Sequence, residues 1–238
     1  MNIKLLQWNI WYKENIDNII RELNKWDVDI ICIQELCTYG NNTDNVDKLN
    51  QCFPYGFFKI ANECGSDRNI GNAIYSKYPI TNKKYTFIQE PGEDKTDPSQ
   101  EGRVYIECEI DIGGCMLNVG TTHSSYTHKF NETTAKDREM NKLIECFNKE
   151  EKYIFTGDLN TPSNSKYIKQ IQEKLIMCDS MRDKTWATKP FSYNGFVEND
   201  LNWKLDYVFK TKDVNVTNCE PLYTIFSDHL PILVNIKV

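Results

Sequence analysis

Residues 28–36 read VDIICIQEL, and this short segment decides the fold class. Val28 to Ile33 is a nearly continuous apolar run rich in β-branched side chains, which predicts a strand buried on both faces. Ile3 to Ile10 has the composition of another strand. Between the two, apolar side chains recur at the spacing of one helical face: Ile16, Ile19, Ile20 and Leu23. The chain therefore opens as a β-α-β unit, which is typical of α/β proteins.

The remainder of the chain continues the alternation of apolar runs and helical patterns. Six further strands are predicted at residues 71–76, 104–110, 116–122, 153–156, 205–210 and 232–238. A helix is predicted from about Thr134 to Phe147, and Ser163 or Asn164 is the expected cap of another. Residues 90–98 form the clearest long loop. We see no repeat or linker, so we expect one domain over residues 1–238.

Composition restricts the possible partners. Of the 238 residues, 40% are hydrophobic and 26% charged, as in ordinary soluble domains. Lys and Arg number 28 against 34 Asp and Glu, a formal net charge of −6, and the lysines form no basic stripe. This pattern argues against tight non-specific binding to a polyanion.

The cysteines and the amino terminus indicate the cellular setting. The nine cysteines contain no CxxC motif and no Cys/His pair at zinc spacing, so reduced, buried thiols are expected. The first residues, MNIKLLQWNIW, are too short and too polar for a secretory signal. No stretch approaches the roughly 20 apolar residues that span a bilayer. We therefore expect a cytoplasmic monomer without stable membrane association.

Polar groups occur where several of the apolar runs end. Glu35 follows Ile30 to Gln34, and a buried carboxylate is costly unless it is paired or binds a metal. Taken singly, Asn9 and His123 fit structural roles better, Glu35 fits either role equally, and His128 is expected to be an ordinary loop residue. Together they supply what metal-assisted phosphoester hydrolysis requires, namely cation ligands, a proton acceptor and hydrogen-bond donors. The set comprises Asn9, Glu35, His123, Asp158, Asn160, Asp206, Asp228 and His229.

In this order the segments resemble the endonuclease/exonuclease/phosphatase superfamily, the group around pancreatic deoxyribonuclease. The resemblance covers residues 5–236, nearly the whole chain. The matching segments are LLQWNI (5–10), IICIQEL (30–36), GNAIYSKYPI (71–80), QEGRVYIECEI (100–110), VGTTHSS (119–125), FTGDLN (155–160), KLDYVF (204–209) and FSDHLPILVNI (226–236).

The resemblance implies a four-layered α/β sandwich, with two mostly antiparallel sheets face to face between helices. It also implies a role for each residue. Glu35 would be the principal Mg²⁺ ligand, with Asn9 and Asp228 completing the metal site. Oxygen ligands suit Mg²⁺ or Mn²⁺, and the lack of thiolates argues against zinc.

The remaining roles implied by the resemblance concern water and phosphate. Asp158 would orient or deprotonate the attacking water, and Asn160 would hold the water and a phosphoryl oxygen. His229 would contact the phosphate, oriented by Asp206, and either Asp158 or His229 would be the base. Two further residues would bind substrate: His123 at the phosphate or the leaving oxygen, and Arg103 from its strand.

The substrate stays open at this point. His123 favours deoxyribonuclease-, sphingomyelinase- or phosphatase-like branches, whereas QEGRV is similar to repair nucleases. The hypotheses are a phosphodiesterase for nucleic acid or nucleotides, a phosphatase or phosphodiesterase for a small phosphorylated metabolite or lipid headgroup, and a silent binding module. The acidic composition slightly favours a small substrate. Residues 185–193 with Trp203 are predicted either to line the site as an aromatic wall or to pack as a loop.

Overall fold

The computed structural model describes residues 1–40, 42–64, 67–94, 98–147, 151–179 and 182–238. Its centre consists of two six-stranded sheets. The first has the order β13 (Asn215–Pro221), β14 (Ile232–Lys237), β1 (Asn2–Asn9), β2 (Ile30–Tyr39), β4 (Arg68–Ser76) and β3 (Tyr55–Cys64). The second has the order β5 (Ile80–Gln89), β6 (Arg103–Ile112), β7 (Cys115–His123), β8 (Tyr153–Asp158), β12 (Asp206–Lys210) and β9 (Ile176–Met177).

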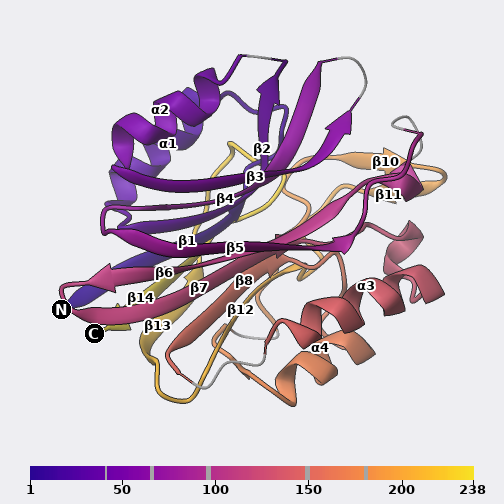
Figure 1. Cartoon of the computed structure of the whole chain (residues 1–238). Coiled ribbons are helices and arrows are strands. Elements are labelled where there is room, and N and C mark those ends of the chain that lie inside the picture. Colours follow the sequence, from indigo (N-terminus) through magenta and orange to yellow (C-terminus); the bar gives the residue numbers. More distant parts are fainter. Residues whose placement is uncertain (41, 65–66, 95–97, 148–150, 180–181) are drawn as a thin grey trace.

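Helices cover the outer face of each sheet (Figure 1). α1 (Ile16–Trp26) and α2 (Asp44–Cys52) lie on the first sheet, and α3 (Thr134–Glu145) and α4 (Lys166–Gln172) lie on the second. Two short 3-10 helices, η1 (Pro98–Gln100) and η2 (His128–Phe130), and a small hairpin of β10 (Phe191–Tyr193) and β11 (Phe196–Glu198) lie in the connections. The expected four-layered sandwich is therefore confirmed.

Three apolar layers hold these elements together. Between the sheets, alternate residues such as Leu5 and Cys32 of the first sheet meet Ile106 and Val119 of the second, all at 0% exposure. The residues between them point outward, so Trp8 packs in the layer under α1 and α2. Phe155, Tyr207 and other side chains form the corresponding layer under α3 and α4. Burial on both faces explains why these strands read as continuous apolar runs rather than as alternating ones.

Each sheet contains one parallel pair, and its other pairs are antiparallel. β1 pairs in parallel with β2, as the β-α-β pattern predicts, and β7 pairs in parallel with β8. The chain ends meet in the first sheet, where β1 also pairs with β14. Parallel neighbours end at the same edge of a sheet. The polar residues that end β1, β7 and β8, namely Asn9, His123 and Asp158, are thereby brought toward one end of the sandwich.

The eight predicted strands are confirmed with shifts of a few residues at their ends. The helix predicted around Ile16 to Leu23 is confirmed as α1, and the helix predicted from about Thr134 to Phe147 is confirmed as α3, which ends at Glu145. α2, β3, β5 and β13 were not predicted, because their faces are mostly half-exposed and polar, which removes the apolar periodicity. The predicted cap of α4 is wrong, since Ser165, not Ser163 or Asn164, accepts the hydrogen bond from Ile168.

Two further predictions are settled only for the described residues. Residues 90–94 of the predicted loop form no regular element, whereas 95–97 lie outside the described residues.

Within the part of the chain that the structure describes, no helix has both the length and the apolar character needed to cross a membrane.

Candidate active site

Strand pairing assembles the centre of the site from three neighbouring strands. His123 ends β7 and lies opposite Asp158, the last residue of β8. On the other side of β8, Asp158 lies opposite Asp206, the first residue of β12. Because the three positions are cross-strand neighbours, their side chains are fixed by sheet geometry rather than by a loop. Asn9 and Glu35 reach the same point from the facing sheet, where Asn9 ends β1.

The position of Glu35 differs from the prediction. The sequence places it after the end of a strand, but β2 continues to Tyr39. Glu35 instead lies in a β-bulge, where the register with β4 shifts between Ile33 and Leu36, and its φ is +61°. A bulge inserts an extra residue and redirects its side chain. The carboxylate consequently turns toward the site, where its Oε2 accepts a hydrogen bond from the Tyr12 amide at 3.0 Å.

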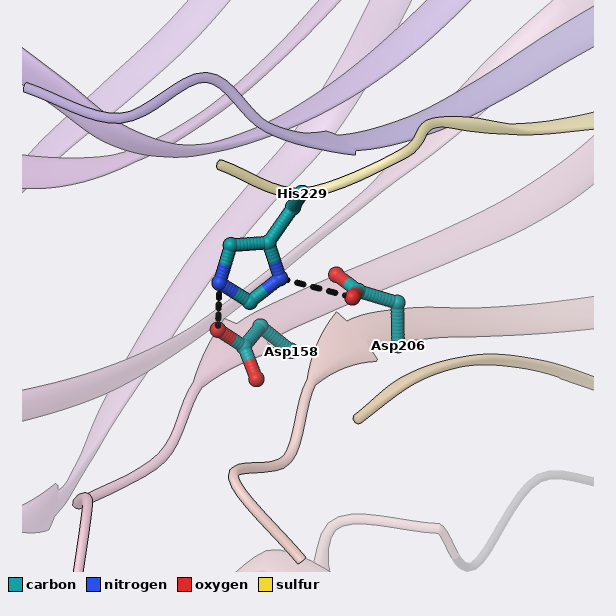
Figure 2. Close-up of side chains that lie close together, drawn as sticks. All are labelled: Asp158, Asp206 and His229. Carbon is teal, nitrogen blue, oxygen red and sulfur yellow. Dashed lines mark hydrogen bonds and ion pairs between the residues drawn. The ribbon is translucent and has the colours of Figure 1, made fainter. Parts of the chain in front are cut away.

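His229 lies between two carboxylates, as Figure 2 shows. Its Nδ1 is 2.8 Å from Asp206 Oδ2, and its Nε2 is 3.6 Å from Asp158 Oδ2. The second oxygen of Asp206 accepts a hydrogen bond from Gln7 Nε2 at 2.7 Å. Ser227 Oγ accepts from the His229 amide at 3.0 Å and anchors the loop. The imidazole is therefore oriented by Asp206 and presents its other nitrogen to Asp158.

Burial and charge shift both pKa values in this array. Burial by itself would lower the pKa of His229, but the charges of Asp206, Asp158 and Asp228 outweigh it and raise the pKa well above its ordinary value. Burial raises the pKa of Asp158 to about 7, although the positive charge of His229 partly opposes that change. Asp158 is thus poised to exchange a proton near neutral pH.

His123 and Asn160 form the adjoining part of the site. His123 Nε2 lies 3.0 Å from Asn160 Nδ2 and 3.5 Å from Asp158 Oδ2. Asn160 is held in a tight turn with φ of +46°, and its backbone amide donates to Asp158 Oδ1 at 2.9 Å. Burial, followed by the nearby positive charges of Arg103, His229 and Lys136, lowers the pKa of His123 well below its usual range. His123 is therefore neutral at physiological pH.

Glu35, Asp228 and Asn9, the predicted metal ligands, lie in different settings. Glu35 and Asp228 line one cavity, and burial together with the Asp228 charge raises the pKa of Glu35. His123 Nδ1 is 3.9 Å from Glu35 Oε1 but is neutral and supplies no countercharge. Two half-buried carboxylates in such surroundings fit a divalent cation with oxygen ligands. Asn9 is fully buried behind them, and its amide donates to Glu35 at 3.2 Å and to Asp158 at 2.9 Å.

A second group also has ligand atoms close together. Those of Asp158, Asp206 and His229 all lie within 4.8 Å of one another. However, both oxygens of Asp206 already have hydrogen-bond partners, Gln7 and His229. The residue is 0% exposed and does not line the cavity. These contacts indicate an array that orients the histidine, and they favour the Glu35–Asp228 pair as the cation site.

Arg103 lies at the cavity from the start of β6. Its Nη2 pairs with Glu101 at 2.5 Å and its Nε is 3.3 Å from Ser125 Oγ.

Lys136 is a supporting residue that sequence reasoning did not find. It is 1% exposed, and its ammonium donates to the carbonyls of Ser125 at 2.7 Å and Leu159 at 3.0 Å. This ammonium connects the two loops that follow β7 and β8, next to His123 and Asn160.

These residues border a cavity of about 610 Å³. The predicted aromatic wall is present on one side, because Trp186, Phe191 and Tyr193 line it and the Trp186 ring donates its Nε1–H to Asp228 Oδ2 at 3.4 Å. His128 is not an ordinary loop residue, since it lies in η2 and also lines the cavity. Tyr12 and Arg68 line it as well and were missed, because neither lies in a segment that carries the family resemblance.

Comparison with known proteins places the chain in a family. The profile of the Endonuclease/Exonuclease/phosphatase family matches residues 6–229. The chain therefore belongs to this family, whose members are phosphoesterase hydrolases. No curated protein matches the chain at a significant level.

Solved structures share the fold at low sequence identity. A family protein from Leptotrichia buccalis has a TM-score of 0.73 at 19% identity, with 99% of this chain and 100% of that chain covered. TDP2 from D. rerio, complexed with a single-strand DNA product, has a TM-score of 0.70 at 13% identity, with coverage of 100% and 99%. A mannosyl-6-phosphatase from Bacteroides thetaiotaomicron has a TM-score of 0.66 at 16% identity, with coverage of 99% and 100%.

Proposed function

We propose that this protein is a Mg²⁺-dependent hydrolase of a small phosphorylated compound, in which water attacks the phosphoester in line. One observation carries the proposal. Groups from both sheets converge on a single cavity, and they include the kinds that phosphoester hydrolysis needs: Glu35, His123, Asp158, Asn160, Asp228 and His229.

Glu35 and Asp228 would hold the cation, and Asn9 would fix the Glu35 carboxylate through its amide. When bound, such a cation neutralises charge on the phosphoryl oxygens. Mn²⁺ has similar ligand preferences and is expected to substitute for Mg²⁺. The relatives' general dependence on divalent cations supports this assignment.

The remaining residues would act on water and on phosphate. Asp158, with a pKa of about 7, would accept the proton of the attacking water, and the Asn160 backbone amide holds that carboxylate in place. His229, protonated and oriented by Asp206, would donate to a phosphoryl oxygen, and neutral His123 would donate to another oxygen of the same group. Fixed donors of this kind stabilise the charge that develops as the phosphoester bond breaks.

Cavity size and charge favour a small substrate over nucleic acid. A volume of about 610 Å³ is that of a small-molecule site, and the aromatic wall bounds one side of it. With a net charge of −6 the chain has more acidic than basic groups, whereas a polyanion groove requires a basic surface. Among the structurally similar proteins, one is a mannosyl-6-phosphatase by its name and another is bound to a single-strand DNA product. The substrate class of this protein must therefore be tested.

The test is hydrolysis of p-nitrophenyl phosphate and bis-p-nitrophenyl phosphate by protein stripped of metal with a chelator and then reloaded. We expect activity to be lost on stripping and restored by Mg²⁺ or Mn²⁺. Full activity of the stripped protein would contradict the metal assignment. Inactivity of the reloaded protein on every phosphoester would instead favour a silent binding module. Sugar phosphates, inositol phosphates, phospholipid headgroups, RNA and plasmid DNA then identify the substrate class.

A further inference from the structure

Arg68 occupies an unusual place on the inner face of the sandwich. Side chains of β4 alternate, so Arg68, Ile70 and Asn72 share one face, and all three line the cavity. Further along that face, Ile74 packs in the apolar layer between the sheets. Arg68 itself is half-buried at the cavity, and partial burial of a cation costs free energy unless an anion compensates it.

The contacts of Arg68 leave its charge without a counterion. Its guanidinium lies over the Tyr12 ring, 4.5 Å from the centroid, and its hydrogen-bond partner is the thiol of Cys64, a weak acceptor. The Nε atom is buried without a hydrogen-bond partner. No carboxylate of the described residues forms an ion pair with Arg68, whereas Arg103, the other arginine of the cavity, is paired with Glu101.

Tyr12 connects Arg68 to the predicted metal site. The Tyr12 backbone amide donates to Glu35 Oε2 at 3.0 Å, so the residue that stacks on Arg68 also contacts the principal predicted metal ligand. The cation–π contact positions the guanidinium, a group that binds anionic oxygens through paired N–H donors. An anionic group bound at Arg68 would therefore lie beside the phosphate that is hydrolysed, in the same cavity.

We propose that Arg68, held by Tyr12, forms a subsite for a second anionic group, a phosphate, on a small substrate. The inference rests on the proposed phosphoesterase function and narrows its substrate to compounds that carry a second phosphate besides the one removed. Arg68 is a specificity-determining residue, and its contact with the substrate does not include the reacting phosphorus.

The experiment compares matched substrates: a sugar bisphosphate with the corresponding monophosphate, and adenosine bisphosphate with adenosine monophosphate. We expect kcat/KM of the wild type to be higher for each bisphosphate by about 10- to 100-fold, the scale of one charge-assisted hydrogen bond. Arg68→Gln should abolish this preference, mainly through KM. Arg68→Lys should retain part of it, since it keeps the charge but loses the planar fork. Arg138→Gln, a change at an exposed arginine of α3, is the control and should leave both ratios unaltered.

Binding to the Asp158→Asn variant, measured by calorimetry with the same bisphosphates, separates this inference from the proposed function. The wild type could hydrolyse none of these substrates while the bisphosphate still binds at least about 10-fold more tightly than the monophosphate. If Arg68→Gln then removes this difference in affinity, the subsite stands although the hydrolase assignment fails. An equal loss for both substrates on Arg68→Gln, or no preference in the wild type, would overturn the subsite. A dependence on Arg68 seen only with a short oligonucleotide would overturn the small-substrate assignment.

Discussion

His229 is the residue on which the site's chemistry depends most directly. Both of its ring nitrogens face carboxylates, Asp206 at 2.8 Å and Asp158 at 3.6 Å. The contact with Asp206 is short and buried, which makes this aspartate an orienting group rather than a metal ligand. Asp158 faces the cavity and carries the pKa suited to proton transfer. The two aspartates therefore have different roles although they are cross-strand neighbours.

Replacing either cavity-facing partner should abolish most turnover. Asp158→Asn and His229→Ala are each expected to lower kcat by about 10²-fold or more, because each removes a base or a charge-stabilising donor. The measurement is kcat for p-nitrophenyl phosphate and bis-p-nitrophenyl phosphate, together with circular dichroism to verify folding. Cys146→Ser, near the end of α3 and away from the cavity, is the control. Near-normal turnover in either site variant combined with loss in Cys146→Ser would refute the site.

Asp206→Asn should shift the titration of His229 to lower pH, because it removes a negative charge that raises the pKa of the histidine. A raised histidine pKa contributes stability that is complete below its unfolded pKa of about 6.5 and is lost as pH rises through the folded value. The variant should accordingly lose most stability, relative to wild type, between about pH 5 and 6.5. NMR of the imidazole and urea unfolding measure the two effects, and an unchanged titration would disprove the coupling.

At the scale of elements, α3 on the outer face of the second sheet stabilises the loops next to the site. α3 begins at the cap Thr133, whose side chain accepts from the Lys136 amide at 3.1 Å. Lys136 then reaches the carbonyls of Ser125 and Leu159, next to the strand ends that carry His123 and Asp158. A buried ammonium can take this position because backbone carbonyls and Glu139, at 3.6 Å, compensate its charge.

Loss of the α3 cap should destabilise the fold modestly. We expect Thr133→Ala to lower the free energy of unfolding by about 0.5–2 kcal/mol, because the Lys136 amide loses its acceptor. Thr134→Ala changes the neighbouring exposed threonine, which provides no such cap, and should have little effect. Urea midpoints of the two variants measure the difference. Equal midpoints would show that the cap contributes nothing measurable.

The thiols of Cys32, which is buried, and Cys178, which is half-buried, should be chemically inert. Burial raises the pKa of Cys32 in β2 and of Cys178 after β9 to about 12. At pH 8 only about one molecule in 10⁴ then carries either thiolate, the reactive form. Because these folded pKa values exceed the unfolded value, the thiols' stabilising contribution is present below about pH 9 and declines above it. Iodoacetamide at pH 8 should therefore leave both thiols unlabelled in the folded protein, as mass spectrometry would show, and their labelling without unfolding would contradict this.

On the scale of the whole molecule, the sandwich couples distant parts of the chain. β1 lies between β2 and β14, and Gln7 of β1 reaches across to Asp206, 199 residues away. The apolar layer between the sheets contains residues from nearly every strand. Neither sheet can bury its inner face without the other, which is the physical basis for expecting one domain.

Unfolding should accordingly be a single cooperative transition. Far-ultraviolet circular dichroism, which reports both sheets, and tryptophan fluorescence, with Trp8 under α1 and Trp186 beside the site, should give coincident urea curves. Two separated transitions would contradict the prediction of one domain over residues 1–238. Sedimentation of the same samples tests the expected monomer, and the cytoplasmic location likewise stays a prediction.

The sequence alone determined the types of the main elements and the polar groups that follow them. Strands such as β2 and β8 are buried on both faces, so their composition is local information that requires no knowledge of partners. The same holds for Asp158 and His229, whose neighbouring residues carry the family resemblance. Polar edge elements such as β3 and β13 could not be predicted, because their stability comes from pairing with a neighbouring strand.

Only the tertiary structure decided how these groups meet. The bulge that turns Glu35 toward the site depends on the register with β4, and the pairing of His229 with Asp206 depends on strand order. The cavity contains Arg68 and His128, which no local pattern distinguishes from surface residues. Burial and proximity to charge arise between segments distant in sequence, and these two quantities set pKa values and cation binding, so the chemistry of the site follows from the assembled sheets.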